Sequence, residues 1–281
     1  MRISVVIPTF NRIEVIQRAI DSVLRQTRPA DQLIVVDDGS TDGTSALLKK
    51  TYGNRLTLIR VTQNNGVSAA RNHGIRECTG DWIALLDSDD EWLETKLATQ
   101  QTALEMQPHV LCHTEEIWIR NGIRVNAMNK HAKRGGDIYQ YCLPLCVISP
   151  SSALISREAF DEAGGFDETL PACEDYDLWL KICARHPVLF IPTPQVIKYG
   201  GHQDQLSRQH WGMDRFRIKA MINSLESGYL TGVQSEKTLE CLLKKARIVR
   251  KGAIKHKNHA MVEYCQQILD RQFNCEKAAN D

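Results

Sequence analysis

The strongest constraint on the fold is an alternation of two periodicities in the first hundred residues. Short aliphatic runs, typical of buried strands, alternate with segments whose apolar residues recur at helical spacing. Strand and helix repeated in this order predict an α/β fold with a mostly parallel, doubly wound (Rossmann-like) sheet. The predicted strands are 3–8, 32–38, 56–61 and 82–87, and the predicted helices are 15–24, 44–50 and 67–77.

Each predicted strand ends in polar residues. Because ligands of a doubly wound sheet bind beyond the carboxyl ends of its strands, these ends predict a binding site. Asp37 fits a structural role in its turn as well as a ligand contact. The four strand ends read "PTFNR" (8–12), "DDGS" (37–40), "VTQNNG" (61–66) and "DSDD" (87–90).

The rest of the chain is expected to be increasingly helical. Helices are predicted at 92–106, 157–163 and 174–185, and two short strands at 188–192 and 196–199. Beyond residue 208 the pattern is wholly helical. We therefore expect a main domain over residues 1–208 and a helical C-terminal region over residues 209–281.

Composition excludes several classes of protein. The chain has 281 residues, 42% of them hydrophobic, and a formal charge of +1, so neither disorder nor nucleic-acid binding is expected. Nine cysteines without a CxxC pair are typical of free thiols in a reducing compartment. No apolar run approaches the roughly 18 residues of a membrane span. The expected location is the cytoplasm, with at most peripheral contact at the inner face of the membrane.

The acidic stretch after residue 86 requires positive compensation. Asp87, Asp89, Asp90 and Glu91 crowd like charges at the end of a buried strand. Asp90 and Glu91 are expected to be the N-cap and a first-turn acid of the following helix. Both phosphate loops, GxGxxG and GxxxxGK[ST], are absent, so a bound diphosphate needs another cation. Asp89 offers the hard oxygen that Mg²⁺ or Mn²⁺ prefers.

Four ordered segments carry a family resemblance. "VVIPTFNR", "VVDDGSTDGT", "NNGVSAARNHGI" and "GDWIALLDSDD" resemble the signature segments of family 2 inverting glycosyltransferases with the GT-A fold. The resemblance is dense over residues 3–107 and resumes at "GGFDE", "CEDYDLWLK" and His202. It implies a GT-A fold with a helical C-terminal appendage. Gln209 stands where processive synthases carry Trp, which favours a non-processive bacterial enzyme.

The resemblance implies a donor site and a metal site. The donor is expected to be a nucleotide sugar, most simply a UDP-sugar, and the metal Mn²⁺ or Mg²⁺. Asp89 and His202 would hold the metal. The residues implied for the donor nucleotide are Pro8, Thr9, Asn11, Arg12, Asp38, Arg71 and Asp87.

A second acidic group is the candidate catalytic base. Glu174, Asp175 and Asp177 occupy the first turn of a predicted helix, where the macrodipole alone favours carboxylates. An inverting transfer also needs a base for the acceptor hydroxyl. The resemblance implies that Asp175 is this base and that Glu174 shapes the site beside it. The acceptor stays open: a glycan, a lipid-linked sugar or another hydroxyl, used in polysaccharide biosynthesis at the cell surface.

The C-terminal region carries a basic segment. Residues 237–257 hold eight Lys or Arg against one acid, Glu240, on a predicted amphipathic helix. This helix either packs on the catalytic domain with a solvated basic face, or meets anionic lipid or a phosphate-bearing acceptor. Two other functions compete with glycosyl transfer: a nucleotidyltransferase that forms nucleotide sugars, and a non-catalytic nucleotide-sugar-binding protein.

Overall fold

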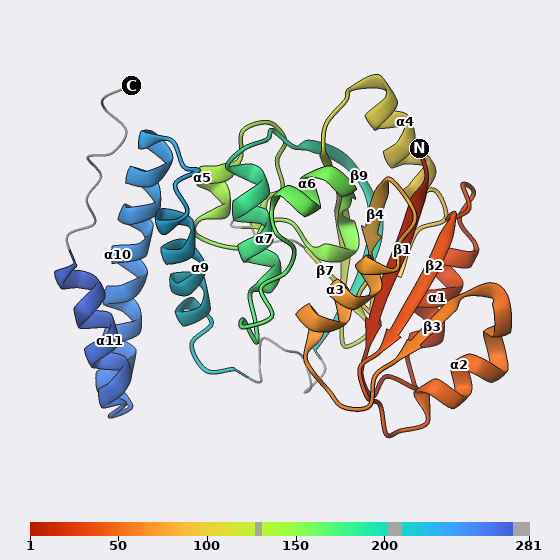
Figure 1. The fold of residues 1–281 in the computed structure, drawn as a ribbon, viewed down its shortest axis with the longest axis horizontal. Helices are drawn as coiled ribbons and strands as arrows, with labels where there is room; N and C mark the ends of the chain where they lie inside the picture. Colours follow the sequence, from red (N-terminus) through yellow and green to blue (C-terminus); the bar gives the residue numbers. More distant parts are fainter. Residues whose placement is uncertain (127–130, 202–209, 272–281) are drawn as a thin grey trace.

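A parallel sheet forms the N-terminal half of the molecule. The computed structural model describes residues 1–126, 131–201 and 210–271. Strands lie in the order β3-β2-β1-β4, joined by helices on both faces (Figure 1). The predicted alternation of strands and helices is confirmed. Its elements are β1 (Ile3–Thr9), α1 (Ile16–Leu24), β2 (Gln32–Asp37), α2 (Thr44–Tyr52), β3 (Thr57–Arg60), α3 (Val67–Arg76) and β4 (Trp82–Leu85).

The sheet continues through strands from the second half of the chain. After β4 come β8 (Leu154–Ser156), β6 (Leu111–Arg120), β9 (Leu189–Gly200) and β5 (Glu91–Trp92), and β7 (Ile123–Val125) pairs with β6. Strands β1 to β4, β6 and β9 run one way, and β5, β7 and β8 run the other. The sheet of the described residues is therefore mostly parallel, as predicted.

The predicted helix over 92–106 begins later. Glu91 and Trp92 pair with β9 as an antiparallel strand, and helix α4 spans Lys96–Met106. The expectation that Asp90 and Glu91 cap this helix is wrong, because Glu91 pairs with β9 and the N-cap position of α4 is Thr95. The two short strands predicted at 188–199 form one strand, with shifts of register where Pro194 faces β6. Proline cannot donate to a ladder, which favours such an irregularity.

Two apolar cores lie on opposite faces of the sheet. Val6, Ile34 and Val36 face one cluster, whereas Val5, Ile7 and Val35 face the other, as the alternation of side chains along a strand requires. Helix α3 approaches the sheet closely at Gly74. A Cβ there would lie 2.6 Å from Val6 Cγ1, so glycine sets the spacing of helix and sheet.

The C-terminal helices pack on the same structure. They are α9 (Asp214–Glu226), α10 (Gly232–Lys255) and α11 (His259–Asp270). Their buried residues join one cluster with those of helix α7 (Glu174–Cys183), as Ile218 and Met221 of α9 do. The predicted C-terminal helices are thus confirmed within the described residues 210–271. None of the helices in the described residues combines the length and hydropathy that a membrane span needs.

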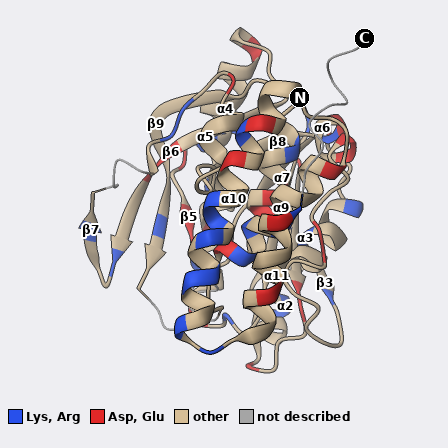
Figure 2. Cartoon of the chain, turned by 90° about the vertical axis from the view of Figure 1, so that its left-hand side faces the viewer, with Lys and Arg blue, Asp and Glu red and all other residues tan. Residues whose placement is uncertain are grey.

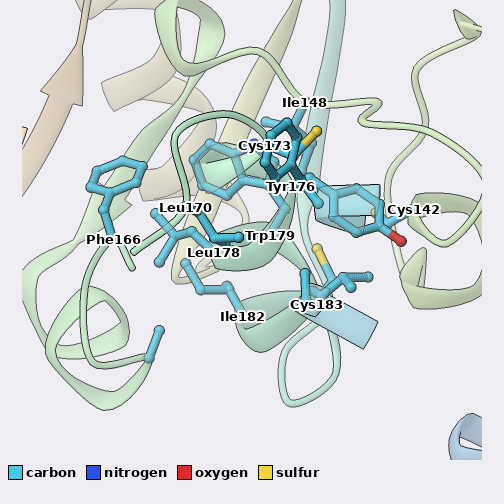
Figure 3. Close-up of a cluster of buried hydrophobic side chains, with 14 of the residues drawn as sticks. Cys142, Ile148, Phe166, Leu170, Cys173, Tyr176, Leu178, Trp179, Ile182 and Cys183 are labelled. Carbon is cyan, nitrogen blue, oxygen red and sulfur yellow. The ribbon is translucent and has the colours of Figure 1, made fainter. Parts of the chain in front are cut away.

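Helix α7 is buried on nearly all sides. Figure 3 shows Tyr176, Trp179 and Ile182 of this helix among apolar side chains of the preceding loop, including Phe166 and Leu170. These aromatic residues of α7 are almost fully buried. The packing fixes the first turn of α7, which carries the acids predicted to be catalytic.

Candidate active site

A cavity of about 820 Å³ opens at the carboxyl ends of β1, β2 and β4. It lies where the topology of the sheet predicts a ligand site. Helices α3, α7 and α9, strands β6 and β9 and residues 146–150 also contribute to its wall. Nine predicted site residues line the cavity: Pro8, Thr9, Arg12, Asp38, Arg71, Asp87, Asp89, Glu174 and Asp175.

One predicted site residue is placed differently. Asn11 lines a smaller pocket of about 270 Å³ next to the cavity, together with Arg12 and Asp89. Its side-chain oxygen accepts the backbone N–H of Thr41 at 2.8 Å, so in this structure it joins two loops. His202 lies outside the described residues.

Arg71 joins the two acidic segments of the site. Its guanidinium donates to Asp87 Oδ1 at 2.7 Å and to Glu174 Oε1 at 2.6 Å, and its side chain is only 4% exposed. Burial alone would raise the pKa of Asp87, but Arg71 and Lys198 outweigh it and lower that pKa. Burial dominates at Glu174 and raises its pKa despite Arg71. Arg71 thereby fixes the end of β4 to the first turn of α7, although Arg71 and Glu174 are 103 residues apart in the sequence.

Lys198, whose side chain is 15% exposed, is a second cation of the site, and the sequence interpretation missed it. Its ammonium lies 2.8 Å from Asp90 Oδ2 and 3.8 Å from Asp87 Oδ2. Burial raises the pKa of Asp90 to about 7 against the effect of Lys198. Antiparallel pairing of β5 with β9 places this lysine beside the acids. The pattern "VIKYG", a lone cation in an apolar strand, was the available signal.

Asp89 is the remaining acid of the predicted metal site. Arg18 donates to its backbone oxygen at 2.6 Å and so fixes the loop, while Asp89 lines the cavity. Among the described residues no group of three or more His, Cys, Asp or Glu lies close enough together to hold a metal ion. A single carboxylate facing a diphosphate still fits Mg²⁺, which takes few protein ligands and fills its shell with water and phosphate oxygens.

Asp37 and Asp38 at the end of β2 shape the turn. Asp37 accepts the N–H of Ser40 at 2.9 Å and the hydroxyl of Ser45, as its structural interpretation requires. Asp38 accepts the backbone N–H groups of Asn65 and Gly66 at 3.0 and 2.8 Å. Burial raises the pKa of Asp38 in spite of these donors. Asp38 therefore ties two strand ends together at the cavity wall.

The three first-turn acids of α7 have different surroundings. Glu174 is bound by Arg71, and Asp177 points into the core, where it pairs with Lys181 at 2.7 Å. Asp175 lines the cavity, and its Oδ2 accepts from the thiol of Cys146 at 3.3 Å. A carboxylate in this position can accept a proton from a bound hydroxyl.

The C-terminal region contributes to the cavity wall. Met213 and Arg217, on either side of the start of α9, line the cavity beyond Asp175. Arg217 Nη1 lies 2.8 Å from Asp214 Oδ1, which also binds Lys245 of α10 at 2.8 Å. The sequence interpretation placed these residues in a region separate from the catalytic domain and missed their part in the site.

Comparison with known proteins identifies the family. The family model described as "Glycosyl transferase family 2" matches residues 4–164, and that described as "Glycosyltransferase like family 2" matches residues 127–221. An uncharacterized glycosyltransferase of Rickettsia bellii is 32% identical over 66% of this chain, but the match spans only 27% of that protein. The uncharacterized glycosyltransferase YwdF of Bacillus subtilis is 30% identical over 70% of this chain and 74% of that protein.

Two further comparisons concern named activities and folds. WfaP of Escherichia coli, a "UDP-Glc:alpha-D-GlcNAc-diphosphoundecaprenol beta-1,3-glucosyltransferase", is 27% identical over 65% of this chain and 70% of that protein. The structure of S. aureus TarS in complex with UDP-GlcNAc superposes with a TM-score of 0.69 and 19% identity. The superposition covers 87% of this chain and 71% of that one. It confirms the predicted GT-A fold.

Proposed function

This chain belongs to glycosyl transferase family 2, and we propose that it transfers a sugar from a nucleotide diphosphate sugar to an acceptor hydroxyl with inversion. The observation that carries the proposal is that the residues predicted for the donor, at the strand ends, line the same cavity as Asp175. Its volume of about 820 Å³ lies within the usual range for small-molecule sites, roughly 300–1,000 Å³.

The donor would bind along the strand ends. Pro8, Thr9, Arg12 and Asp38 would contact the base and ribose, with Asn11 supporting their loop. Asp87 and Arg71 would lie near the sugar and the phosphates. A UDP-sugar is the donor that the relatives favour, because WfaP is named for UDP-Glc and TarS was solved with UDP-GlcNAc.

Asp175 would act as the base. Single displacement with inversion requires a base that takes the proton of the attacking hydroxyl, and a carboxylate can serve as this base. Glu174, held by Arg71, would keep the first turn of α7 in register with Asp87. Arg71 therefore has a positioning role as well as a charge that the donor phosphates can meet.

A divalent cation, Mn²⁺ or Mg²⁺, would be held by Asp89 and the donor diphosphate, with His202 as a further ligand. Such a cation neutralises charge that develops on the departing diphosphate. For the acceptor, the name of WfaP favours a sugar on a polyprenyl diphosphate, which would place the protein in cell-surface polysaccharide assembly.

Calorimetric titration of UDP into the protein, with and without Mn²⁺, tests this proposal. We expect UDP to bind with metal, and Asp89→Asn to weaken binding at least tenfold in the presence of Mn²⁺. Asp161→Asn, an exposed acid on helix α6 (Arg157–Glu162), is the matched control and should bind as the unchanged protein does. Equal metal-dependent binding by Asp89→Asn would overturn the metal assignment.

The competing functions have their own readouts. Binding of GDP or dTDP in place of UDP would keep the family but change the donor. Release of pyrophosphate from a nucleoside triphosphate and a sugar phosphate would instead indicate a nucleotidyltransferase. Donor binding without hydrolysis or transfer over a panel of UDP-sugars and acceptors would favour a binding protein.

A further inference from the structure

Helix α10 has a continuous basic face. Exposed cations recur along it at spacings of three, four and seven residues, which places them on one side of a helix. Two exposed acids, Glu236 and Glu240, lie near the start of α10, where Glu240 is 3.5 Å from Lys237, and no acid follows them in the helix. Figure 2 shows the Lys and Arg residues recurring along α10. The basic face comprises Lys237, Lys244, Arg247, Lys251 and Lys255.

The other side of α10 packs on the protein. Leu242, Ala246 and Val249 are buried in the cluster that also contains side chains of α7. Lys245 points inward as well, where it donates to Asp214 and to the backbone oxygen of Pro144, both at 2.8 Å. Lys245 therefore serves packing and is not available to a ligand. The exposed cations of the basic face can either be solvated or contact anionic lipid or a phosphate-bearing acceptor.

Exposed apolar side chains flank the basic face. Ile248 and Ile254 of α10 are 56% and 54% exposed, and Trp211 is 41% exposed. The ring of Trp211 stacks edge-on against His256 at the end of α10, with 6.1 Å between centroids. Cations interspersed with large apolar side chains, one of them Trp, are typical of helices that lie in a membrane interface.

We propose that the basic face of α10, with Ile248, Ile254 and Trp211, docks on the surface of an anionic lipid bilayer. Nucleic acid would attract the cations but leave exposed isoleucines without a partner, whereas a bilayer accepts both. The proposal goes beyond the proposed function, since docking needs no catalysis. Lys245 and Asp214 connect α10 to Arg217 in the cavity wall. Docking of α10 would also hold the protein at the surface on which a lipid-borne acceptor, if that is the acceptor of the proposed function, is found.

Co-sedimentation of the full chain with vesicles tests the docking. Vesicles of neutral phosphatidylcholine are compared with vesicles containing about 30% phosphatidylglycerol, at about 0.05 M and about 0.5 M salt. We expect binding to the anionic vesicles that weakens with salt. Each surface cation contributes about fivefold to partitioning, so Lys244→Glu/Lys251→Glu should lower it about 25-fold or more.

The matched control is Lys49→Glu/Lys50→Glu on α2. It makes the same change of charge on exposed residues at the opposite end of the molecule (Figure 1) and should alter partitioning less than about twofold. Ile248→Ser/Ile254→Ser tests the contribution of the exposed isoleucines. Because salt screens the cations, this variant should lower the binding to anionic vesicles that is still measured at the higher salt concentration. Equal losses in both charge variants would overturn docking through α10.

Two further outcomes separate the alternatives. Binding to a labelled RNA oligonucleotide but to neither vesicle would overturn the membrane proposal in favour of nucleic acid. UDP titration of the same variants distinguishes failure of the docking proposal from failure of the proposed function. Lys244→Glu/Lys251→Glu should bind UDP as the unchanged protein does. If neither the unchanged protein nor any variant binds UDP, the proposed function is contradicted, but the result with vesicles is unaffected.

Discussion

Asp87 illustrates how an acid at the end of a buried strand is stabilised. Arg71 and Lys198 supply positive charge within the protein, from α3 and from β9. The metal inferred from the sequence is thus not required to compensate Asp87 or Asp90. Its assignment to Asp89 rests on the chemistry of the donor diphosphate and stays a prediction.

At the residue scale, Asp175→Asn should nearly abolish transfer, by about 10³-fold or more in kcat, while the Kd for UDP stays unchanged. The amide keeps the size of the side chain but cannot accept the proton of the acceptor hydroxyl. Transfer assays with radiolabelled donor and titration of UDP measure the two quantities. Turnover close to that of the unchanged protein would refute the assignment of the base.

Asp177→Asn is the matched control on the same helical turn. It breaks the ion pair with Lys181 in the core, so it should lower the melting temperature. Because Asp177 does not line the cavity, kcat of the folded protein should be retained. If Asp175 is catalytic and Asp177 structural, Asp175→Asn lowers kcat, whereas Asp177→Asn lowers the melting temperature.

Also at the residue scale, His113 on β6 should make stability depend on pH. Burial, with a smaller effect of Lys133, lowers the pKa of His113 to about 3. The pKa of His113 in the folded state lies below its unfolded value of about 6.5. At pH values between these two, His113 is protonated in the unfolded state but not in the folded state. Stability is therefore present above pH 6.5 and is lost as the pH falls toward 3.

Urea unfolding at pH 7 and pH 5 measures this effect. The free energy of unfolding should fall by about 2 kcal/mol more in the unchanged protein than in His113→Gln. Glutamine keeps a donor for the backbone oxygen of Arg134, which His113 binds at 2.8 Å. Identical pH dependence in the two proteins would show that His113 does not resist protonation.

At the element scale, the helices differ in how closely they approach their neighbours. Gly74 of α3 lies against Val6 and Val36, where an added Cβ would meet their methyl groups at 2.6 and 2.9 Å. Gly252 of α10 has only Trp211 nearby, at 3.9 Å. The same change from glycine to alanine should therefore have opposite effects in the two helices.

Gly74→Ala should lower the free energy of unfolding by about 1–2 kcal/mol, because overpacking exceeds the gain in helix propensity. Gly252→Ala should raise it by up to about 1 kcal/mol, since the added methyl fits and unfolded-state entropy falls. Denaturant titrations of both variants measure the difference. A stabilised Gly74→Ala would mean that α3 can move away from the sheet at little cost.

At the scale of the whole molecule, the C-terminal helices share a core with the catalytic sheet. Ile218 and Met221 of α9 are fully buried in the cluster that includes Trp179 of α7. Removing such side chains exposes their apolar partners, at about 1.5–3 kcal/mol for each large side chain. The boundary predicted at residue 208 thus divides residues that pack together.

A chain ending at residue 208 should accordingly lose cooperative thermal unfolding and UDP binding. A chain ending at residue 271, which keeps α9 to α11, should retain both. Circular dichroism melts and UDP titration of the two proteins give the answer. Cooperative unfolding with UDP binding by residues 1–208 would instead establish them as an independent catalytic domain.

The sequence by itself determined strands β1 to β4, the family and the part of the cavity lining that lies at the ends of these strands. Alternating strands and helices fix which ends meet at one edge, so Thr9, Asp38 and Asp89 could be grouped without coordinates. These predictions depend on local patterns, because the periodicity of a helix or strand and the polar motif at a strand end are each contained in a short stretch of sequence. The roles of these residues in donor, metal and proton chemistry stay predictions.

Only the tertiary structure decided which charges pair and what closes the site. Lys198 reaches Asp90 across 108 residues, and Arg71 reaches Glu174 across 103. Pairing with β9 also turned Glu91 from an expected helix start into a strand residue, and packing brought Met213 and Arg217 to the cavity. Such contacts depend on the path of the whole chain, for which a single sequence carries no periodic signal.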